Sequence, residues 1–132
     1  TGVERYFATF NRGTSLVNLQ DYNGAAEAYD QAFRLYADLP LGNRPWRTVW
    51  YQTGPYFAYF YSGRYADVDA LATQTIDAAS EPYLEESWYW RALARDMMGD
   101  RQRAVEDLRQ SLVYHPDFIP SLTALQNMGV TP

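Results

Sequence analysis

Three short stretches of the chain share one pattern, and this repeat constrains the fold more than any other feature. In each stretch a turn residue is followed five positions later by a small or β-branched residue, as in a tight turn between two packed helices. Two of the three turn residues are glycine, which readily adopts the left-handed conformation that ends a helix. The stretches are QDYNGA at 20–25, GRYADV at 63–68 and GDRQRA at 99–104. They predict three helix–turn–helix pairs.

The segments around these turns have helical periodicity. After the first turn, one predicted face holds Ala25, Ala28, Tyr29, Ala32, Phe33 and Tyr36. After the third, one face holds Ala104, Val105, Leu108, Ser111 and Leu112, while Arg103, Glu106, Asp107 and Gln110 lie largely away from it. The tail repeats the spacing with Ile119, Leu122 and Leu125. We expect this tail to form a seventh helix that covers the open end of the stack.

The pattern predicts an all-α fold in a single domain, residues 1–132. Its three antiparallel pairs span about 3–38, 44–79 and 82–115, and the capping helix spans about 117–128. Because the chain begins at Thr1, without Met or a leader, we expect it to be part of a longer or processed polypeptide.

Composition narrows the class of protein further. Apolar residues make up 47% of the chain and aromatic residues 17%, which argues against a disordered segment. No apolar run approaches the roughly 20 residues of a membrane-spanning helix, so we expect no membrane insertion by this segment. The net charge of −5 disfavours nucleic acid as a partner, because such binding depends on neutralising phosphates.

The turns and their flanks resemble the tetratricopeptide repeat, a family of helix–turn–helix units of roughly 34 residues. The resemblance implies a right-handed superhelical stack that binds proteins or peptides in a concave groove. It rests on Gly13, Leu16, Asp21, Tyr22, Ala25, Tyr29 and Ala32 in the first unit, on Tyr59, Gly63, Tyr65 and Ala72 in the second, and on Trp88, Ala92, Gly99, Asp100, Ala104, Leu108, Ser111 and Pro116 in the third.

The second unit departs from the family pattern. The interval between the first two turns implies roughly nine inserted residues, which we expect to lengthen a helix or loop around 39–46. Gly54 and Pro55 also fall within the first helix of this unit. Because proline removes a backbone hydrogen bond, this helix is expected either to be long and bent or to begin at Pro55.

By register with the family, the first helices of the three units line the groove. This places the candidate peptide-binding residues at Phe7, Phe10, Trp50, Phe57, Phe60, Tyr61, Tyr89 and Leu93. The family's clamp for chaperone carboxylates is absent, since the corresponding positions carry Phe10, Thr14, Gly54, Glu86 and Trp90. We therefore do not expect a chaperone-tail receptor, and the resemblance implies apolar or aromatic peptide anchors instead.

The aromatic segment of the second unit carries two stripes at helical spacing. One comprises Trp46, Trp50, Thr53, Phe57 and Phe60, and the other comprises Tyr56 and Tyr59. One stripe suffices to pack a helix against its partner. The other either contacts neighbouring units as part of the core or meets another chain or a ligand.

Residues with catalytic potential do not form a recognisable constellation. The chain has no Cys, and its one histidine, His115, is expected at a helix end in a surface or capping role. We therefore predict no enzyme activity, no metal site and no cofactor. The arginines of the third unit, interspersed with carboxylates, are interpreted mainly as a solvated helix surface.

The sequence thus predicts a non-catalytic protein- or peptide-binding scaffold. The alternative is a structural domain that forms a homodimer or contacts other domains of a larger parent protein. The stretch from Arg44 to Tyr61 is similar to the repeat tails of bacterial C39-like cysteine peptidases, which implies such a parent.

Overall fold

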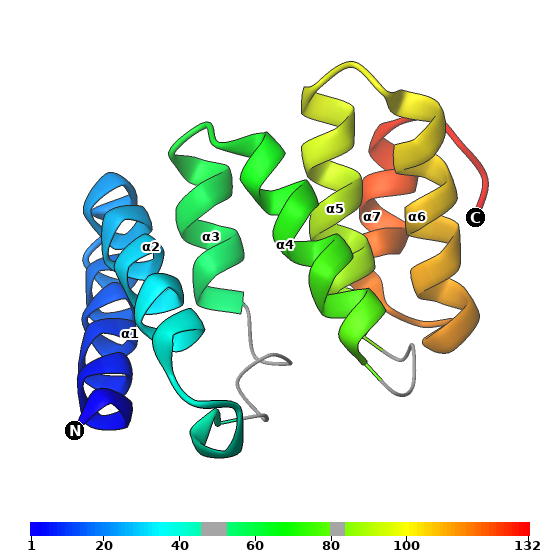
Figure 1. Cartoon of the computed structure of the whole chain (residues 1–132). Helices are drawn as coiled ribbons and strands as arrows, with labels where there is room; N and C mark the ends of the chain where they lie inside the picture. Colours follow the sequence, from blue (N-terminus) through cyan, green and yellow to red (C-terminus); the bar gives the residue numbers. More distant parts are fainter. Residues whose placement is uncertain (46–52, 80–83) are drawn as a thin grey trace. The chain divides into compact units, whose positions relative to one another are not determined.

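The computed structural model describes residues 1–45, 53–79 and 84–132. Over these residues the chain forms seven α-helices and one short 3-10 helix, with no strand (Figure 1). The predicted all-α fold is therefore confirmed. The helices form two compact units, Thr1–Arg64 and Tyr65–Pro132. Their boundary falls inside the predicted second repeat.

The first compact unit contains α1 (Gly2–Asn18), α2 (Tyr22–Asp38), the 3-10 helix η1 (Leu41–Asn43) and α3 (Thr53–Tyr61). The helices α1 and α2 lie side by side along their length, and α3 packs against both (Figure 1). The face that α2 buries is largely the predicted apolar face, with small residues around Tyr29. The largest buried side chains of the unit are Tyr6, Tyr29 and Tyr56. The core of this unit is therefore built largely from rings.

The second compact unit contains α4 (Tyr65–Ala78), α5 (Glu85–Met97), α6 (Arg101–Tyr114) and α7 (Ile119–Asn127). Each of these helices packs against the next one in the chain. The buried centre of α5, α6 and α7 consists of small and aliphatic residues, Ala92, Ala104, Leu108 and Leu125. At the α6–α7 contact, the fully buried hydroxyls of Ser111 and Ser121 lie 2.6 Å apart and form a hydrogen bond.

All three predicted turns end their helices with a residue in the left-handed conformation, and a fourth such turn follows α7. The φ angles are 61° at Gln20, 79° at Gly63, 89° at Gly99 and 72° at Gly129. In each turn the next residue donates its N–H to a carbonyl five positions back, at 2.8 to 3.0 Å, which satisfies an otherwise unpaired acceptor at the helix end. Because these bonds lie within six residues, each helix end is set locally.

The insertion between the first two turns is a loop as far as residue 45, where the described segment ends. Helix α2 ends at Asp38, and the chain continues through the buried Leu39 and the short helix η1. The guanidinium of Arg44 donates to the carbonyls of Leu39 and Ala37, at 3.1 and 2.8 Å. These bonds fold the loop back onto the end of α2.

The described part of α3 begins at Thr53, and Pro55 is its third residue. The predicted longer and bent form of this helix would include residues 46–52, which lie outside the described residues.

Two predicted faces are wrong in detail. Asp107, expected on the polar face of α6, is only 4% exposed because two arginines of α5 pair with it. Ile119, expected on the apolar face of α7, is 65% exposed. It is the first residue of that helix, whereas Leu125, near the other end, fills the core.

Candidate functional site

The aromatic residues of α3 divide between the core and the surface. Tyr56 and Tyr59 are buried, with 1% and 4% exposure. Phe57 and Phe60 are only partly buried, and Tyr61 is 52% exposed. The stripe of the two tyrosines therefore suffices for packing, and the stripe that contains Phe57 and Phe60 reaches the surface.

The exposed ring of Tyr61 is surrounded by other aromatic rings. Its centroid lies 5.5 Å from Phe57, 5.3 Å from Phe60 and 5.1 Å from Tyr22, the first residue of α2. We call these four residues, Tyr22, Phe57, Phe60 and Tyr61, the α3 aromatic surface. No charged residue occurs in α3 as the structure describes it, from Thr53 to Tyr61. Such a surface offers contact area to apolar and aromatic groups and offers two tyrosine hydroxyls for hydrogen bonds.

The groove residues predicted on α1 have different surroundings. Phe10 packs beside the buried Tyr6, and its ring lies 5.0 Å from that of Tyr29 in an edge-to-face arrangement. Phe7 is 39% exposed, with its ring 5.2 Å from Tyr6. Phe10 thus contributes mainly to the core, and Phe7 offers a partly open ring. Trp50 lies outside the described residues.

The groove residues predicted in the second compact unit are Tyr89 and Leu93, both partly buried on α5. Tyr89 packs against the core that α5, α6 and α7 share, and its ring meets that of Phe118 at 6.0 Å. Tyr89 therefore helps to hold the end of the unit together. The structure brings together the α3 members of the predicted set within the first unit.

A polar cluster fixes the end of α3 that carries Tyr61. The carboxylate of Asp30 on α2 accepts two bonds from the Arg64 guanidinium, at 2.8 and 2.9 Å, and one from the Tyr59 hydroxyl at 2.8 Å. The guanidinium also lies 4.6 Å from the centre of the Tyr59 ring. Since Arg64 directly follows the turn that ends α3, these bonds hold that turn against α2. The sequence shows no sign of this pair, because its partners are 34 residues apart.

Asp30 should make the first unit sensitive to acid. Burial by itself would raise the pKa of Asp30, but the hydrogen bonds from Arg64 and Tyr59 and the charges of Arg64 and Arg34 outweigh it and hold the pKa below the ordinary 3.8. A lowered pKa in the folded protein means that the carboxylate stabilises the fold fully above the ordinary value. This stabilisation is lost as the pH falls through the lower, folded value.

We therefore expect Asp30→Asn to reduce the loss of stability that the wild type shows on acidification. The measurement is the urea midpoint of the helical circular dichroism signal at pH 7 and near pH 3. The exposed Asp38→Asn serves as the control and should leave the acid-dependent change as in the wild type. If acidification lowered the urea midpoint equally in the wild type and in Asp30→Asn, the result would contradict a lowered pKa of Asp30.

Two positions that the resemblance assigns to the carboxylate clamp have a packing role here. Thr14 and Gly54 both lie against the hydroxyl of Tyr29, which is fully buried, and the Thr14 hydroxyl forms a 2.9 Å hydrogen bond with it. Burial raises the pKa of this tyrosine, and the hydrogen bond with Thr14 partly offsets the rise. Gly13 faces the same ring, since a Cβ there would lie 2.7 Å from Tyr29 Cε1. Tyr29 is thus enclosed by α1 and α3, and this part of the first unit is closed to ligands.

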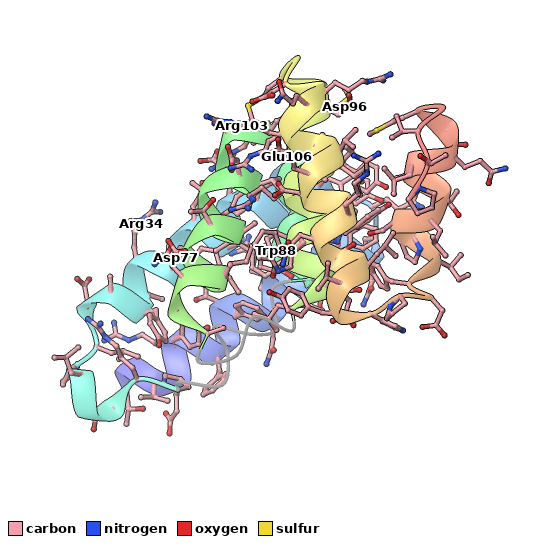
Figure 2. The ribbon with its side chains drawn as sticks, turned by 90° about the vertical axis from the view of Figure 1, so that its right-hand side faces the viewer. Arg34, Asp77, Trp88, Asp96, Arg103 and Glu106 are labelled. Atoms are coloured by element: carbon pink, nitrogen blue, oxygen red, sulfur yellow. The ribbon has the colours of Figure 1, made fainter. Side chains whose placement is uncertain are left out.

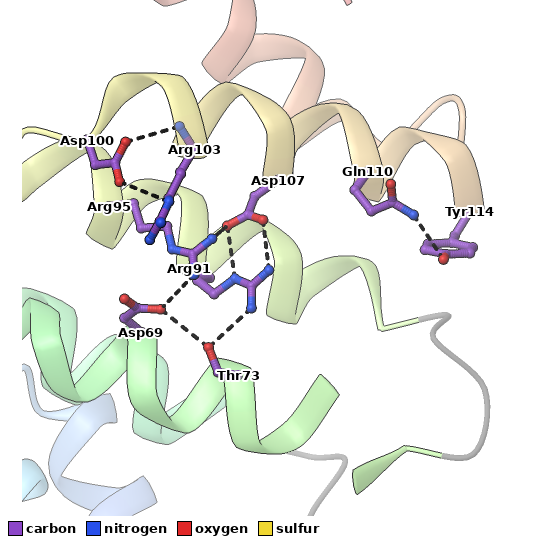
Figure 3. Close-up of polar contacts among 9 residues, drawn as sticks. All are labelled: Asp69, Thr73, Arg91, Arg95, Asp100, Arg103, Asp107, Gln110 and Tyr114. Carbon is purple, nitrogen blue, oxygen red and sulfur yellow. Dashed lines mark hydrogen bonds and ion pairs between the residues drawn. The ribbon is translucent and has the colours of Figure 1, made fainter. Parts of the chain in front are cut away.

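In the second compact unit, arginines of α5 form an internal network (Figure 3). Arg91 makes two bonds to Asp107, at 2.9 and 2.8 Å, and one to the hydroxyl of Thr73 at 3.1 Å. Arg95 bonds the same carboxylate at 2.9 Å and pairs with Asp69 at 3.4 Å. The network joins α4, α5 and α6, so the interpretation of these two arginines as solvated surface is wrong.

The remaining arginines of the predicted third repeat also have partners within the chain. Arg101 pairs with Asp96 at 3.2 Å, and Arg103 pairs with Asp100 at 3.5 Å. Figure 2 shows Asp96 and Arg103 near the turn between α5 and α6. Arg109 donates to the carbonyl of Thr131 at 3.0 Å. A basic patch aimed at an acidic partner is therefore not found at these positions.

His115 occupies the C-terminal cap of α6, in agreement with its predicted role at a helix end. Its ring nitrogens lie 3.4 Å from a Glu85 oxygen and 3.1 Å from an Asp117 oxygen. Among residues 1–45, 53–79 and 84–132, no three His, Cys, Asp or Glu residues come together in a way that could hold a metal ion. Within the same ranges, no helix is long and apolar enough to cross a membrane.

Sequence reasoning missed Tyr22 as a member of the α3 aromatic surface. The repeat pattern assigns Tyr22 to the first turn, and its contact with Tyr61 joins residues far apart in the chain. The one indication in the sequence is the residue type of Tyr22, since a tyrosine has an apolar ring and a polar tip that suit a partly exposed contact.

The described helices define a helical-repeat protein built from antiparallel pairs that are joined by short left-handed turns. The tetratricopeptide repeat family matches residues 86–117, which comprise most of α5, all of α6 and the segment that follows. This match supports a tetratricopeptide-type domain, and repeats of this type are typically non-catalytic scaffolds for protein interactions. No curated protein matches the chain. The similarity to C39-like peptidase tails has no support from these comparisons and stays a prediction.

Proposed function

We propose that the chain is a non-catalytic scaffold module that binds a protein or peptide, and that the α3 aromatic surface is part of its binding site. One observation carries the proposal: α3 packs through Tyr56 and Tyr59, yet keeps Phe57, Phe60 and Tyr61 at least partly exposed. A helix that needed its rings only for packing would bury both stripes. Exposed clusters of large aromatic groups are typical of interaction sites.

The chemistry of this surface defines the kind of ligand. Because Thr53–Tyr61 carries no charge, the surface offers no ionic contact of its own and should prefer peptides with apolar or aromatic anchors. The fixed end of α3, held by Asp30 and Arg64, lowers the entropic cost of ordering Tyr61 when a ligand binds. Phe7, whose ring is partly open, is proposed as a further contact for the ligand, while Trp50, Tyr89 and Leu93 stay predictions.

Selection of a random peptide library on the immobilised chain tests the proposal. We expect the selected peptides to be enriched in aromatic and large apolar residues. Tyr61→Ala and Phe57→Ala are each expected to weaken binding of the best peptide about tenfold or more, or about 1.4 kcal/mol, by removing contact area. Fluorescence anisotropy with the labelled peptide measures the affinity, and circular dichroism shows whether the helices are kept.

The matched control is Ile119→Ala, which removes a large apolar group that is 65% exposed on α7. It should leave the affinity unchanged. An equal loss in all three variants, or selected peptides without any apolar preference, would contradict the proposal.

The alternative function is structural, with the same surface meeting a second copy of the chain or another domain of a parent protein. The exposure of Tyr61 favours this alternative as much as it favours a peptide. Light scattering separates the two functions: a dimer that Tyr61→Ala converts to a monomer would support self-association instead of peptide binding.

A further inference from the structure

Nearly all arginines that the structure describes have an internal partner, and this makes two exceptions informative. Arg47 lies outside the described residues. Five of the described arginines pair with carboxylates: Arg64, Arg91, Arg95, Arg101 and Arg103. Two others, Arg44 and Arg109, donate to backbone carbonyls. The charge of Arg34 acts on Asp30. Among the described arginines, that leaves Arg5 and Arg12 of α1, whose guanidinium groups form no hydrogen bond or ion pair with another described residue.

Arg5 and Arg12 lie on one face of α1. They are two helical turns apart, or about 10 Å along the axis, and both are exposed. Helical neighbours three or four positions away usually supply the carboxylate for such an arginine. Here those neighbours are Thr1, Gly2, Ala8, Thr9, Ser15 and Leu16, none of which is acidic.

The rest of this face consists of small residues and one exposed apolar residue. Ala8 and Ser15 share it with the two arginines, and Leu19, just beyond the end of the helix, is 76% exposed. The buried residues of α1, Tyr6 and Gly13, lie on another side of the helix. We call the five residues Arg5, Ala8, Arg12, Ser15 and Leu19 the α1 arginine face. It is separate from the α3 aromatic surface, which lies on α2 and α3.

We propose that the α1 arginine face docks an acidic segment of a partner protein. Guanidinium groups match carboxylates in paired, parallel hydrogen bonds, and the small residues between them allow a second backbone to approach. Carboxylates two helical turns apart on a partner helix have the same spacing as Arg5 and Arg12. An apolar side chain of the same segment then covers Leu19.

The net charge of the chain favours a peptide over a larger polyanion as the partner of this face. The chain carries a net charge of −5, so nucleic acid or an anionic membrane would meet repulsion from most of the protein. Two arginines also neutralise too few phosphates to offset that repulsion. A short acidic segment contacts only the face on which Arg5 and Arg12 lie.

The test uses the full chain and a fluorescein-labelled helical peptide of about 15 residues that carries two Glu residues two turns apart and one Leu. A matched peptide has Gln in both Glu positions. We expect the Glu peptide to bind and the Gln peptide to bind at least about tenfold more weakly. The variant Arg5→Gln/Arg12→Gln should weaken the Glu peptide by a similar factor. Binding should also decrease as salt is added.

The control variant is Arg101→Gln/Arg103→Gln, which removes two exposed arginines that already have their own carboxylates. It should leave the affinity for the Glu peptide nearly unchanged. Tyr61→Ala should also leave it unchanged, so this test and the test of the α3 aromatic surface can fail separately. If Arg5→Gln/Arg12→Gln disturbs the helical signal, Arg5→Lys/Arg12→Lys replaces it; this variant keeps the charge and should bind with intermediate affinity.

Four results would overturn the proposal. The first is a Gln peptide that binds as tightly as the Glu peptide, and the second is an equal loss of affinity in the control variant. The third is a wild-type dimer, seen by light scattering, that Arg5→Gln/Arg12→Gln dissociates, which would assign the face to a second copy. The fourth is binding to phosphatidylserine-containing vesicles in preference to the peptide, which would assign the face to a membrane.

Discussion

Replacing Asp107 by Ala is expected to lower the free energy of unfolding by about 3–5 kcal/mol, the cost of leaving buried positive charge without its partner. The side chain of Arg91 is 11% exposed and that of Arg95 is 17% exposed, so water cannot readily replace the carboxylate that both of them bond. The measurement is urea unfolding followed by tryptophan fluorescence, to which Trp88 and Trp90 of α5 contribute. We expect the midpoint to fall to a much lower urea concentration.

Asp96→Ala is the matched control for this substitution. It removes the partner of Arg101, whose side chain is 60% exposed, and should cost less than about 1 kcal/mol. Arg91→Met/Asp107→Leu gives a second control, because replacing both members of a buried pair by apolar groups is usually far less costly than removing one. If Asp107→Ala and Asp96→Ala destabilised the protein equally, the network would have no special role in stability.

Gly54→Ala is expected to destabilise the first unit by about 1–3 kcal/mol, although alanine normally favours a helix over glycine. The added methyl group would collide with the hydroxyl of Tyr29, which is fully buried and cannot move aside. Gly42→Ala is the control, since nothing lies within 4 Å of a Cβ at that position. It should be neutral or slightly stabilising.

Tyr29→Phe separates this collision from other effects. Without the hydroxyl, the nearest atom to a Cβ added at Gly54 becomes the ring carbon Cζ, at 3.1 Å. Gly54→Ala should therefore cost much less when it is combined with Tyr29→Phe. Gly13→Ala should not be rescued in this way, because its Cβ would meet ring carbons at 2.7 and 2.9 Å that phenylalanine retains. Equal rescue of both substitutions in urea unfolding would refute the geometry of this contact.

The turns are predictable because their signals are local. A glycine at position 63 or 99 and the two helical periodicities around it lie within one short stretch of sequence, and the bonds that form the turn span six residues. Gln20 is identified by its place in the repeat, since glutamine does not favour the left-handed conformation that it adopts here. The helices follow from these turns and from the apolar spacing between them.

The polar networks are not predictable from the sequence. Asp107 has the spacing of a solvated residue of α6, and its partner Arg91 lies on another helix, 16 residues earlier. Nothing in the sequence distinguishes such a buried pair from the exposed pair of Arg103 and Asp100. Burial depends on how three helices pack, and that information is distributed over the whole unit.

The candidate site is predictable in part. The two aromatic stripes of α3 follow from spacing alone, but which of them faces the core depends on the positions of α1 and α2. The rings of Tyr56 and Tyr59 turn toward the core, so the stripe of Phe57 and Phe60 is left at the surface. Helical spacing assigns Tyr89 to a groove but gives no sign that its ring contacts Phe118. Phe118 belongs to a different segment, the one just before α7.

The local hydrogen bonds at the four left-handed turns have a consequence for synthesis of the chain. Each helix stop is complete once the residue after the turn has been added, and it needs no side chain from a later helix. A chain emerging from the ribosome can therefore fix the length of α1 before α2 exists, and then pair the two helices as soon as α2 appears. We expect the first compact unit to begin folding before the second is complete, since each helix packs mainly against its neighbours in the chain.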